Sequence, residues 1–143
     1  MKKILVTGGL GFIGSHTVVE LQNKGFEVVI IDDLSNSKID VLEKITEITG
    51  IKPLFHKIDL RVKADVTSFF DTNKVDGVIH FAAFKAVGES IQKPLAYYEN
   101  NIGSLVYLLQ EMKNRSIDHF IFSSSCTVYG QADALPINEN API

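Results

Sequence analysis

The chain has 143 residues, of which 45% are hydrophobic and 22% charged, and its formal net charge is −3. This composition is that of a globular chain with one sizeable core, and it excludes both an intrinsically disordered protein and two ordinary domains. The basic residues are scattered rather than gathered in a stripe, and no run approaches the ~20 apolar residues of a membrane span, so we expect no nucleic-acid partner and no membrane partner.

The first predicted element is a strand over residues 4–6, which leads into the segment Thr-Gly-Gly-Leu-Gly-Phe-Ile-Gly at residues 7–14. A buried strand, a glycine turn and a helix form the dinucleotide-binding arrangement. In that arrangement Gly8 permits a tight turn, Gly11 lets a pyrophosphate approach the backbone, and Gly14 lets helix and sheet pack closely. The N–H groups and the positive dipole end of the helix then face the phosphates. We therefore predict a phosphate-binding turn, with an ordinary tight turn as the alternative.

The second strand, over residues 27–31, ends on a carboxylate, Asp32. A first helix precedes it, with apolar residues on one side and Gly25 as its end. Asp32 lies close to the roughly 20-residue offset from the glycine turn at which a ribose-binding carboxylate is expected. Because Asp33 adds a second negative charge and no arginine lies nearby, we expect NAD rather than NADP. The alternative is that Asp32 merely ends the strand.

A second helix follows a short polar turn at residues 33–37, in which Ser35 or Ser37 can cap the helix. Gly50 ends it. Helical spacing predicts that four apolar residues form its inner face. These are Ile39, Leu42, Ile45 and Ile48.

A third strand over residues 52–58 precedes Asp59, whose side chain is expected either to contact adenine or to cap a helix. Val66, Phe69 and Phe70 mark the third helix. A fourth strand spans residues 75–80, beginning near Gly77. Strands that alternate with helices in this way predict a parallel sheet with right-handed crossovers.

The last elements are a loop over residues 81–90, a long helix from Pro94, and a fifth strand over residues 120–122. The apolar face of the helix is predicted from residues 95, 98, 102, 105, 109 and 112. The fold class is therefore α/β, a Rossmann-type doubly wound parallel sheet. It is incomplete, with about five strands where six are normal. We expect residues 1–143 to be a NAD-binding domain truncated at its C-terminal end, with the substrate domain absent.

The serine run after the fifth strand, residues 123–125, lies where ligands bind in open α/β sheets. A hydroxyl there can hydrogen-bond a substrate oxygen during proton transfer, although serines are also common turn formers. The single cysteine, Cys126, excludes an intrachain disulfide, and no secretion signal is evident, so we expect a cytoplasmic protein. The four histidines show no metal-ligand spacing, which predicts no metal site.

Several segments together resemble the UDP-glucose 4-epimerases of the extended short-chain dehydrogenase/reductase group. They are residues 7–14, Asp32 with Asn36 and Ser37, residues 80–90 (His-Phe-Ala-Ala-Phe-Lys-Ala-Val-Gly-Glu-Ser), and residues 123–130. The resemblance implies a bound NAD that removes hydride from C4 of the sugar and returns it to the other face of a 4-keto intermediate. The net reaction interconverts UDP-glucose and UDP-galactose, and the family is homodimeric through a helix bundle.

The resemblance also implies a role for each matching residue. Phe12 and Ile13 would lie at the pyrophosphate, residues 32–37 around the adenosine ribose, and Asp59 with Leu60 at the adenine. Ser125 would be the catalytic hydroxyl that helps to move the C4 proton. The predicted cofactor-binding residues are Gly8, Gly11, Phe12, Ile13, Gly14, Asp32, Asp33, Asn36, Ser37, Asp59, Leu60, Phe81, Ala82, Lys85, Asn100 and Ser123.

Two features depart from the family. One residue fewer separates the paired asparagines, Asn100 and Asn101, from Gly103, so the helix register cannot be carried over there. The family base is a tyrosine followed four positions later by a lysine, which lowers the tyrosine pKa. Tyrosines 97, 98, 107 and 129 are followed at that spacing by Asn, Ile, Glu and Asp. We therefore expect the 143 residues alone not to epimerise.

Several alternatives remain at this point. One is a non-catalytic NAD-binding module or a truncated remnant. Another is a nucleotide-sugar 4,6-dehydratase or decarboxylase, although a dehydratase needs an Asp-Glu pair where this chain has Ser125 to Thr127. A 4-epimerase of N-acetylated hexosamines also stays open, because the pocket that would contact the 2-substituent is not in this chain.

Overall fold

The computed structural model describes residues 1–130 and 136–141. Within these residues, five strands form one parallel sheet in the order β3-β2-β1-β4-β5. This order, with a crossover from β3 to β4, is the doubly wound Rossmann-type arrangement, so the predicted fold class is confirmed. The strands are β1 (Lys3–Thr7), β2 (Glu27–Asp32), β3 (Leu54–Lys57), β4 (Gly77–His80) and β5 (His119–Phe122).

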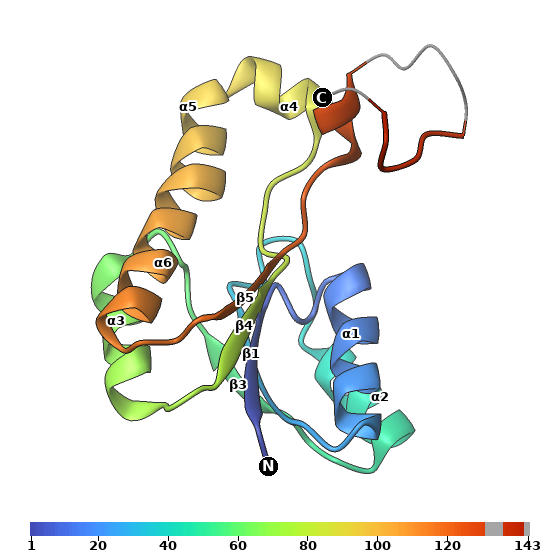
Figure 1. The fold of residues 1–143 in the computed structure, drawn as a ribbon, viewed down its shortest axis with the longest axis vertical. Coiled ribbons are helices and arrows are strands. Elements are labelled where there is room, and N and C mark those ends of the chain that lie inside the picture. Colours follow the sequence, from blue (N-terminus) through green and yellow to red (C-terminus); the bar gives the residue numbers. More distant parts are fainter. Residues whose placement is uncertain (131–135, 142–143) are drawn as a thin grey trace.

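Helices cover both faces of the sheet (Figure 1). α1 (Phe12–Asn23) and α2 (Asp40–Thr49) lie on one face, and α3 (Lys63–Thr72) and α6 (Ser104–Asn114) lie on the other. The chain between β4 and α6 forms α4 (Val87–Gln92), α5 (Pro94–Tyr98) and a π-helical turn, η1 (Glu99–Gly103), while a 3-10 turn, η2 (Cys126–Tyr129), follows β5. In the part of the chain that the structure describes, no helix is both long and apolar enough to cross a membrane.

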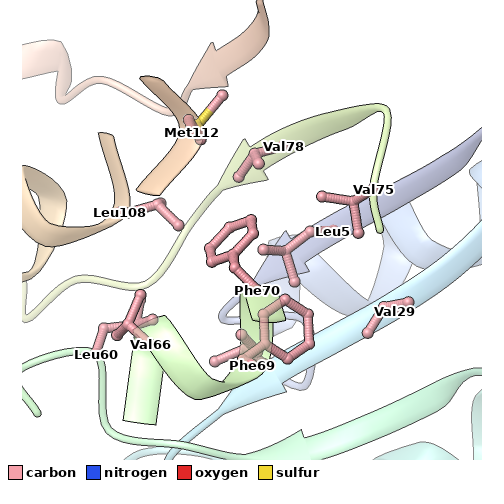
Figure 2. Close-up of a cluster of buried hydrophobic side chains, with 11 residues drawn as sticks. Leu5, Val29, Leu60, Val66, Phe69, Phe70, Val75, Val78, Leu108 and Met112 are labelled. Carbon is pink, nitrogen blue, oxygen red and sulfur yellow. The ribbon is translucent and has the colours of Figure 1, made fainter. Parts of the chain in front are cut away.

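The core consists of two clusters of apolar side chains, one on each face of the sheet. Neighbouring residues of a strand point to opposite faces, so Leu5 of β1 belongs to one cluster and Val6 to the other. Figure 2 shows the first cluster, in which Phe70 of α3 lies between Leu5 of β1 and Leu108 of α6, while Phe69 lies on the side of Val29 of β2. Because the central strands are buried on both faces, they read as continuous apolar runs in the sequence.

The inner face of α2 is narrower than the sequence predicts. Leu42 and Ile45 are buried, as expected, but Ile39 and Ile48 are 52% and 68% exposed, so their assignment to this face is wrong. The predicted serine cap is also wrong, because no side chain caps α2. The hydroxyl groups of Ser35 and Ser37 instead donate to the carboxylates of Asp33 and Asp32, at 2.7 and 2.6 Å, and charged acceptors form the stronger hydrogen bonds.

The long helix predicted from Pro94 exists as the consecutive elements α5, η1 and α6. Of its predicted apolar face, Met112 is buried in the core, but the residues nearest to Pro94 are exposed. Leu95, Tyr98 and Ile102 are 82%, 68% and 53% exposed. The buried residues of α6 are Ser104, Leu108, Glu111 and Met112. A π-helical turn is wider than an α-helical turn and shifts the phase of the residues on either side. A stripe extrapolated at α-helical spacing from residue 95 to residue 112 therefore does not follow one face.

The segment expected to be a loop over residues 81–90 is shorter than predicted, because α4 begins at Val87. Residues 81–86 belong to no helix or strand. α4 has no buried residue, which explains why hydrophobic periodicity gave no sign of it. The loop that remains therefore lies between the end of β4 and an exposed helix.

Candidate cofactor site

A cavity of about 670 Å³ opens at the carboxyl ends of the strands. All the residues that the sequence analysis assigns to a site lie in its lining, although they come from segments far apart in the chain. The lining includes Gly8, Gly11, Phe12, Ile13, Gly14, Asp32, Asp33, Asn36, Ser37, Asp59, Leu60, Phe81, Ala82, Lys85, Asn100, Ser123 and Ser125. The fold thus gathers these residues around one cavity, and their individual roles stay predictions.

The glycine turn after β1 has a backbone that leaves no space for side chains. Gly8 has φ +67°, and a Cβ there would lie 2.8 Å from the Ala82 nitrogen. A Cβ on Gly14 would lie 2.2 Å from the Gly8 carbonyl oxygen. The turn is held by hydrogen bonds from the Gly8 nitrogen to the Ile31 oxygen, at 2.8 Å, and from the Gly11 nitrogen to the Gly8 oxygen, at 3.1 Å. Only glycine fits at positions 8 and 14 without movement of the backbone.

The N-terminus of α1 presents uncompensated positive charge to the cavity. Gly11 is the N-cap, so no side chain caps the first N–H groups of the helix, and its first turn contains no acidic residue. The first N–H groups of any α-helix lack partners within the helix, and the dipole is positive at this end. Gly11, Phe12 and Ile13, which surround this terminus, line the cavity. The arrangement fits the pyrophosphate of a dinucleotide.

Asp32 joins the glycine turn to the loop after β2. The residue as a whole is 7% exposed, and its carboxylate accepts three hydrogen bonds. Oδ1 accepts from the Leu34 nitrogen at 3.0 Å and the Ser37 hydroxyl at 2.6 Å, and Oδ2 accepts from the Leu10 nitrogen at 3.1 Å. A carboxylate has about two acceptor sites on each oxygen, so Oδ2 retains capacity for one more donor. A ribose hydroxyl fits this position.

The structure brings an arginine close to these carboxylates, which corrects the expectation that none lies nearby. Arg61 donates to Asp59 from Nε at 2.9 Å and from a terminal nitrogen at 2.7 Å. The hydrogen bonds between the two side chains lower the pKa of Asp59 and raise the pKa of Arg61. The negative charge of Asp33 makes a smaller contribution to the raised pKa of Arg61. Because Asp59 holds the guanidinium in a two-pronged ion pair, Arg61 is engaged by a protein carboxylate.

Asp59 also has a local role that the sequence did not suggest. Its Oδ1 accepts from the Arg61 backbone nitrogen at 2.9 Å, two residues along the chain, which forms a turn before α3. The N-cap of α3 is Val62, so the expectation that Asp59 caps this helix is wrong. Asp59 and Leu60 still line the cavity, and contact with adenine stays a prediction.

The lining also includes residues to which the sequence analysis gave no role in the site, among them His80, Tyr97 and Asn101. Asn101 makes two hydrogen bonds to the backbone of Phe84, and Tyr97 makes two to Ala86. A pair of asparagines on an otherwise apolar helix was the available signal for Asn101. Nothing in the sequence indicated Tyr97, because its partner depends on how the loop after β4 folds back.

Ser123, Ser124 and Ser125 follow β5 directly and line the cavity. The Ser123 nitrogen donates to the His80 oxygen at 3.1 Å, which extends the pairing of β5 with β4 to the cavity edge. Over residues 1–130 and 136–141, no three histidine, cysteine, aspartate or glutamate side chains gather closely enough to hold a metal ion. The cavity thus combines an uncapped helix N-terminus, the carboxylate of Asp32 and the serines after β5.

Comparison with known proteins identifies a family with these features. Residues 4–143 match the NAD dependent epimerase/dehydratase family. Over 140 residues the chain is 50% identical to a UDP-glucose 4-epimerase of Haemophilus influenzae, an alignment that covers 98% of this chain and 41% of that protein. The chain thus spans about two fifths of the length of the curated relatives that it matches.

Two solved structures are similar over 99% of this chain and 42% of their own. One is UDP-glucose 4-epimerase from Bifidobacterium longum in complex with NAD+ and UDP, with 47% identity and a TM-score of 0.93. The other is the enzyme from Stenotrophomonas maltophila with bound NAD and formylated UDP-arabinopyranose, with 45% identity and a TM-score of 0.92. Because the family match covers nearly the whole length of the sequence, this chain belongs to the NAD dependent epimerase/dehydratase family.

Proposed function

We propose that residues 1–143 are the NAD-binding portion of a UDP-glucose/UDP-galactose 4-epimerase and that they carry no substrate domain. The observation that carries this proposal is the single cavity that joins the glycine turn, Asp32 and the serines after β5. The 50% identity to the Haemophilus influenzae UDP-glucose 4-epimerase supports the substrate class.

The residues of the cavity fit the successive parts of NAD. The N–H groups at the start of α1 would bind the pyrophosphate, because they have no side-chain cap and no acidic neighbour in that turn. Oδ2 of Asp32 would accept from a hydroxyl of the adenosine ribose, with Asn36 and Ser37 beside it. Asp59 and Leu60 would lie at the adenine. The rest of the cofactor would be lined by Phe81, Ala82, Lys85, Asn100 and Ser123.

When bound, NAD would accept hydride from C4 of the sugar and return it to the opposite face of the 4-keto sugar. Ser125 would hydrogen-bond the C4 oxygen and help to move its proton. A base of lowered pKa is also needed, and none of the four tyrosines has a lysine four positions on. We therefore propose that these 143 residues bind NAD without epimerising UDP-sugars.

The exposed apolar side of α5, η1 and α6 supports a homodimer as the assembly of the full-length protein. Leu95, Tyr98 and Ile102 are more than half exposed there, and contiguous exposed apolar residues are typical of interaction surfaces. Sedimentation velocity over a range of concentrations tests this assembly.

The single cysteine supports the cytoplasm as the compartment.

Calorimetric titration of the purified chain with NAD is the first experiment. We expect one NAD per chain and no epimerase turnover above that of a Ser125→Ala variant. Absence of NAD binding would contradict the proposal, and turnover by the chain would contradict its second part. The source reading frame beyond the codon for Ile143 provides a second test. A tyrosine followed four positions later by a lysine is expected there, and a stop codon would leave only an NAD-binding module.

A further inference from the structure

Two side chains from the helical run after Pro94 bind the backbone of the cavity loop. Oδ1 of Asn101 accepts from the Phe84 nitrogen, and its Nδ2 donates to the Phe84 oxygen, both at 2.8 Å. The Tyr97 hydroxyl accepts from the Ala86 nitrogen at 3.1 Å, and its single proton has two acceptors within reach, the Ala86 oxygen at 2.9 Å and Oε2 of Glu89 at 3.1 Å. Asn101 thus bonds both backbone groups of Phe84, and Tyr97 binds the Ala86 nitrogen and lies within hydrogen-bond distance of its oxygen.

The two side chains are themselves held in place. Tyr97 belongs to α5 and Asn101 to η1, and their hydrogen bonds to Ala86 and Phe84 show that both face the loop. Nδ2 of Asn100 donates to Oδ1 of Asn101 at 2.9 Å, and the Ser104 hydroxyl donates to the Asn100 oxygen. The Tyr97 ring packs against the Phe84 ring with centroids 5.5 Å apart. The π-helical turn η1 therefore belongs to a network that reaches the loop.

Lys85 lies between the two residues that are bound in this way, and it lines the cavity. The loop is attached at its two ends, where the Phe81 nitrogen donates to the Thr7 oxygen and the Ala86 oxygen accepts from the Ser90 nitrogen of α4. Between these ends, residues 82–85 belong to no helix or strand. With the backbone groups on both sides of it bound to Tyr97 and Asn101, the position from which the Lys85 side chain extends is fixed. A loop held in this manner does not lose conformational entropy when a ligand binds, which favours affinity.

We propose that Tyr97 and Asn101 are positioning residues for Lys85, which they hold where its ammonium group reaches NAD in the cavity. This inference rests on the proposed function, because it requires NAD as the ligand. In this role neither Tyr97 nor Asn101 contacts the cofactor. Because both residues affect NAD binding only through the position of Lys85, substituting them should no longer change the affinity for NAD once the Lys85 side chain is removed.

A double-mutant cycle on NAD affinity tests this dependence. We expect Tyr97→Phe to raise the Kd for NAD roughly fivefold, because it removes the hydroxyl that links α5 to the Ala86 backbone and to Glu89. In a Lys85→Ala background the same change is expected to alter the Kd less than about twofold. Tyr98→Phe is the matched control, since that side chain is 68% exposed, and it is expected to leave the Kd unchanged. Equal effects of Tyr97→Phe in both backgrounds would overturn the positioning role.

Amide hydrogen exchange without NAD tests the contacts independently. Tyr97→Phe is expected to speed exchange at the Ala86 nitrogen, while the amides of Leu5 and Val6 in β1 stay protected. Asn101→Asp, which keeps an acceptor for the Phe84 nitrogen but loses the donor to its oxygen, is expected to loosen the loop in the same way. Unchanged exchange at Ala86 would refute the inference that Tyr97 holds the loop. Failure of the wild-type chain to bind NAD would instead refute the proposed function, and with it the role of the two residues toward NAD.

Discussion

The Nδ1 atom of His80 lies 2.7 Å from the hydroxyl oxygen of Thr7, at the point where the central strands β4 and β1 reach the cavity. Thr7 and His80 are opposite each other in the parallel pair, and His80 is 2% exposed. Its ring also stacks on Phe122 of β5, with centroids 5.8 Å apart. Burial lowers the pKa of His80 to about 4, so the imidazole is neutral in the folded chain at neutral pH.

The stability of the chain should depend on pH because of His80. Between its unfolded pKa of 6.5 and its folded pKa of about 4, the unfolded state binds the additional proton, so stability rises with pH across this window. We expect His80 alone to make the free energy of unfolding about 3 kcal/mol lower at pH 4 than at pH 7. Urea unfolding at a series of pH values measures this change.

The variant His80→Asn provides the control for that slope, because asparagine does not titrate. Its stability at pH 7 is expected to be lower, but the rise in stability between pH 4 and 6.5 should be lost. The lowered pKa values of Asp59 and Glu89 affect only the acid end of this window, because the stability that they contribute is lost as pH falls through their ordinary values of 3.8 and 4.5. The slopes of the two proteins are therefore compared between about pH 5 and 6.5. An unchanged slope in His80→Asn would assign the effect to other groups.

Alanine at Gly14 should disrupt the glycine turn. Its Cβ would lie 2.2 Å from the Gly8 oxygen and 2.9 Å from the Gly9 Cα, and both are backbone atoms that cannot move alone. We expect a loss of about 3 kcal/mol of stability. The matched control is Gly88→Ala in α4, where a Cβ meets nothing within 4 Å, and it should be neutral or slightly stabilising. Thermal unfolding compares them, and equal melting temperatures would contradict the steric argument.

The strands could be predicted from the sequence because buried parallel strands are continuous apolar runs. β2, for example, was expected over residues 27–31 and covers Glu27–Asp32. The glycine spacing likewise predicts the turn, since only backbone geometry is involved. These features are local, so a single sequence contains the information that specifies them.

The features that could not be predicted depend on contacts between distant segments. The buried face of α6 includes Glu111 because Arg115 and Thr67 provide partners, which no hydrophobic pattern indicates. Arg61 comes near Asp33 only after β3 pairs with β2 in the sheet. The phase shift at η1 likewise required the structure, because a π-helical turn has no clear signal in the sequence.

Removal of the Glu111 side chain should weaken the packing of α6 on α3. Glu111 is 4% exposed, accepts from the Thr67 hydroxyl at 2.8 Å and forms an ion pair with Arg115. Glu111→Ala removes the acceptor of the Thr67 hydroxyl, whereas Arg115 keeps its ion pair with Asp71 and its hydrogen bond to the Phe70 oxygen, so we expect a loss of about 2 kcal/mol. Lys44→Ala, which breaks the exposed Asp40–Lys44 pair of α2, should cost less than about 0.5 kcal/mol. Urea unfolding of both variants measures the difference, and equal small losses would refute the role of Glu111.

Asparagine at position 32 should weaken both the protein and its affinity for NAD. In either orientation of the amide, the new NH₂ group faces a donor, namely the Leu10 nitrogen or the pair formed by the Leu34 nitrogen and the Ser37 hydroxyl. One buried donor then loses its acceptor, for which we expect a cost of about 2 kcal/mol in stability. Asp118→Asn on the exposed segment before β5 serves as the control, and urea unfolding provides the measurement.

Cofactor titrations separate the two roles assigned to Asp32. A ribose hydroxyl bound to a charged acceptor is worth more than one bound to a neutral acceptor, so the Kd of Asp32→Asn for NAD should rise about tenfold. Loss of the negative charge also removes repulsion of a 2′-phosphate, so the ratio of NADP affinity to NAD affinity should increase. If the variant were less stable but kept its NAD affinity and its preference for NAD, the role of Asp32 would be limited to joining the glycine turn to the loop after β2. The ribose would then have to be bound by Asn36 and Ser37 instead.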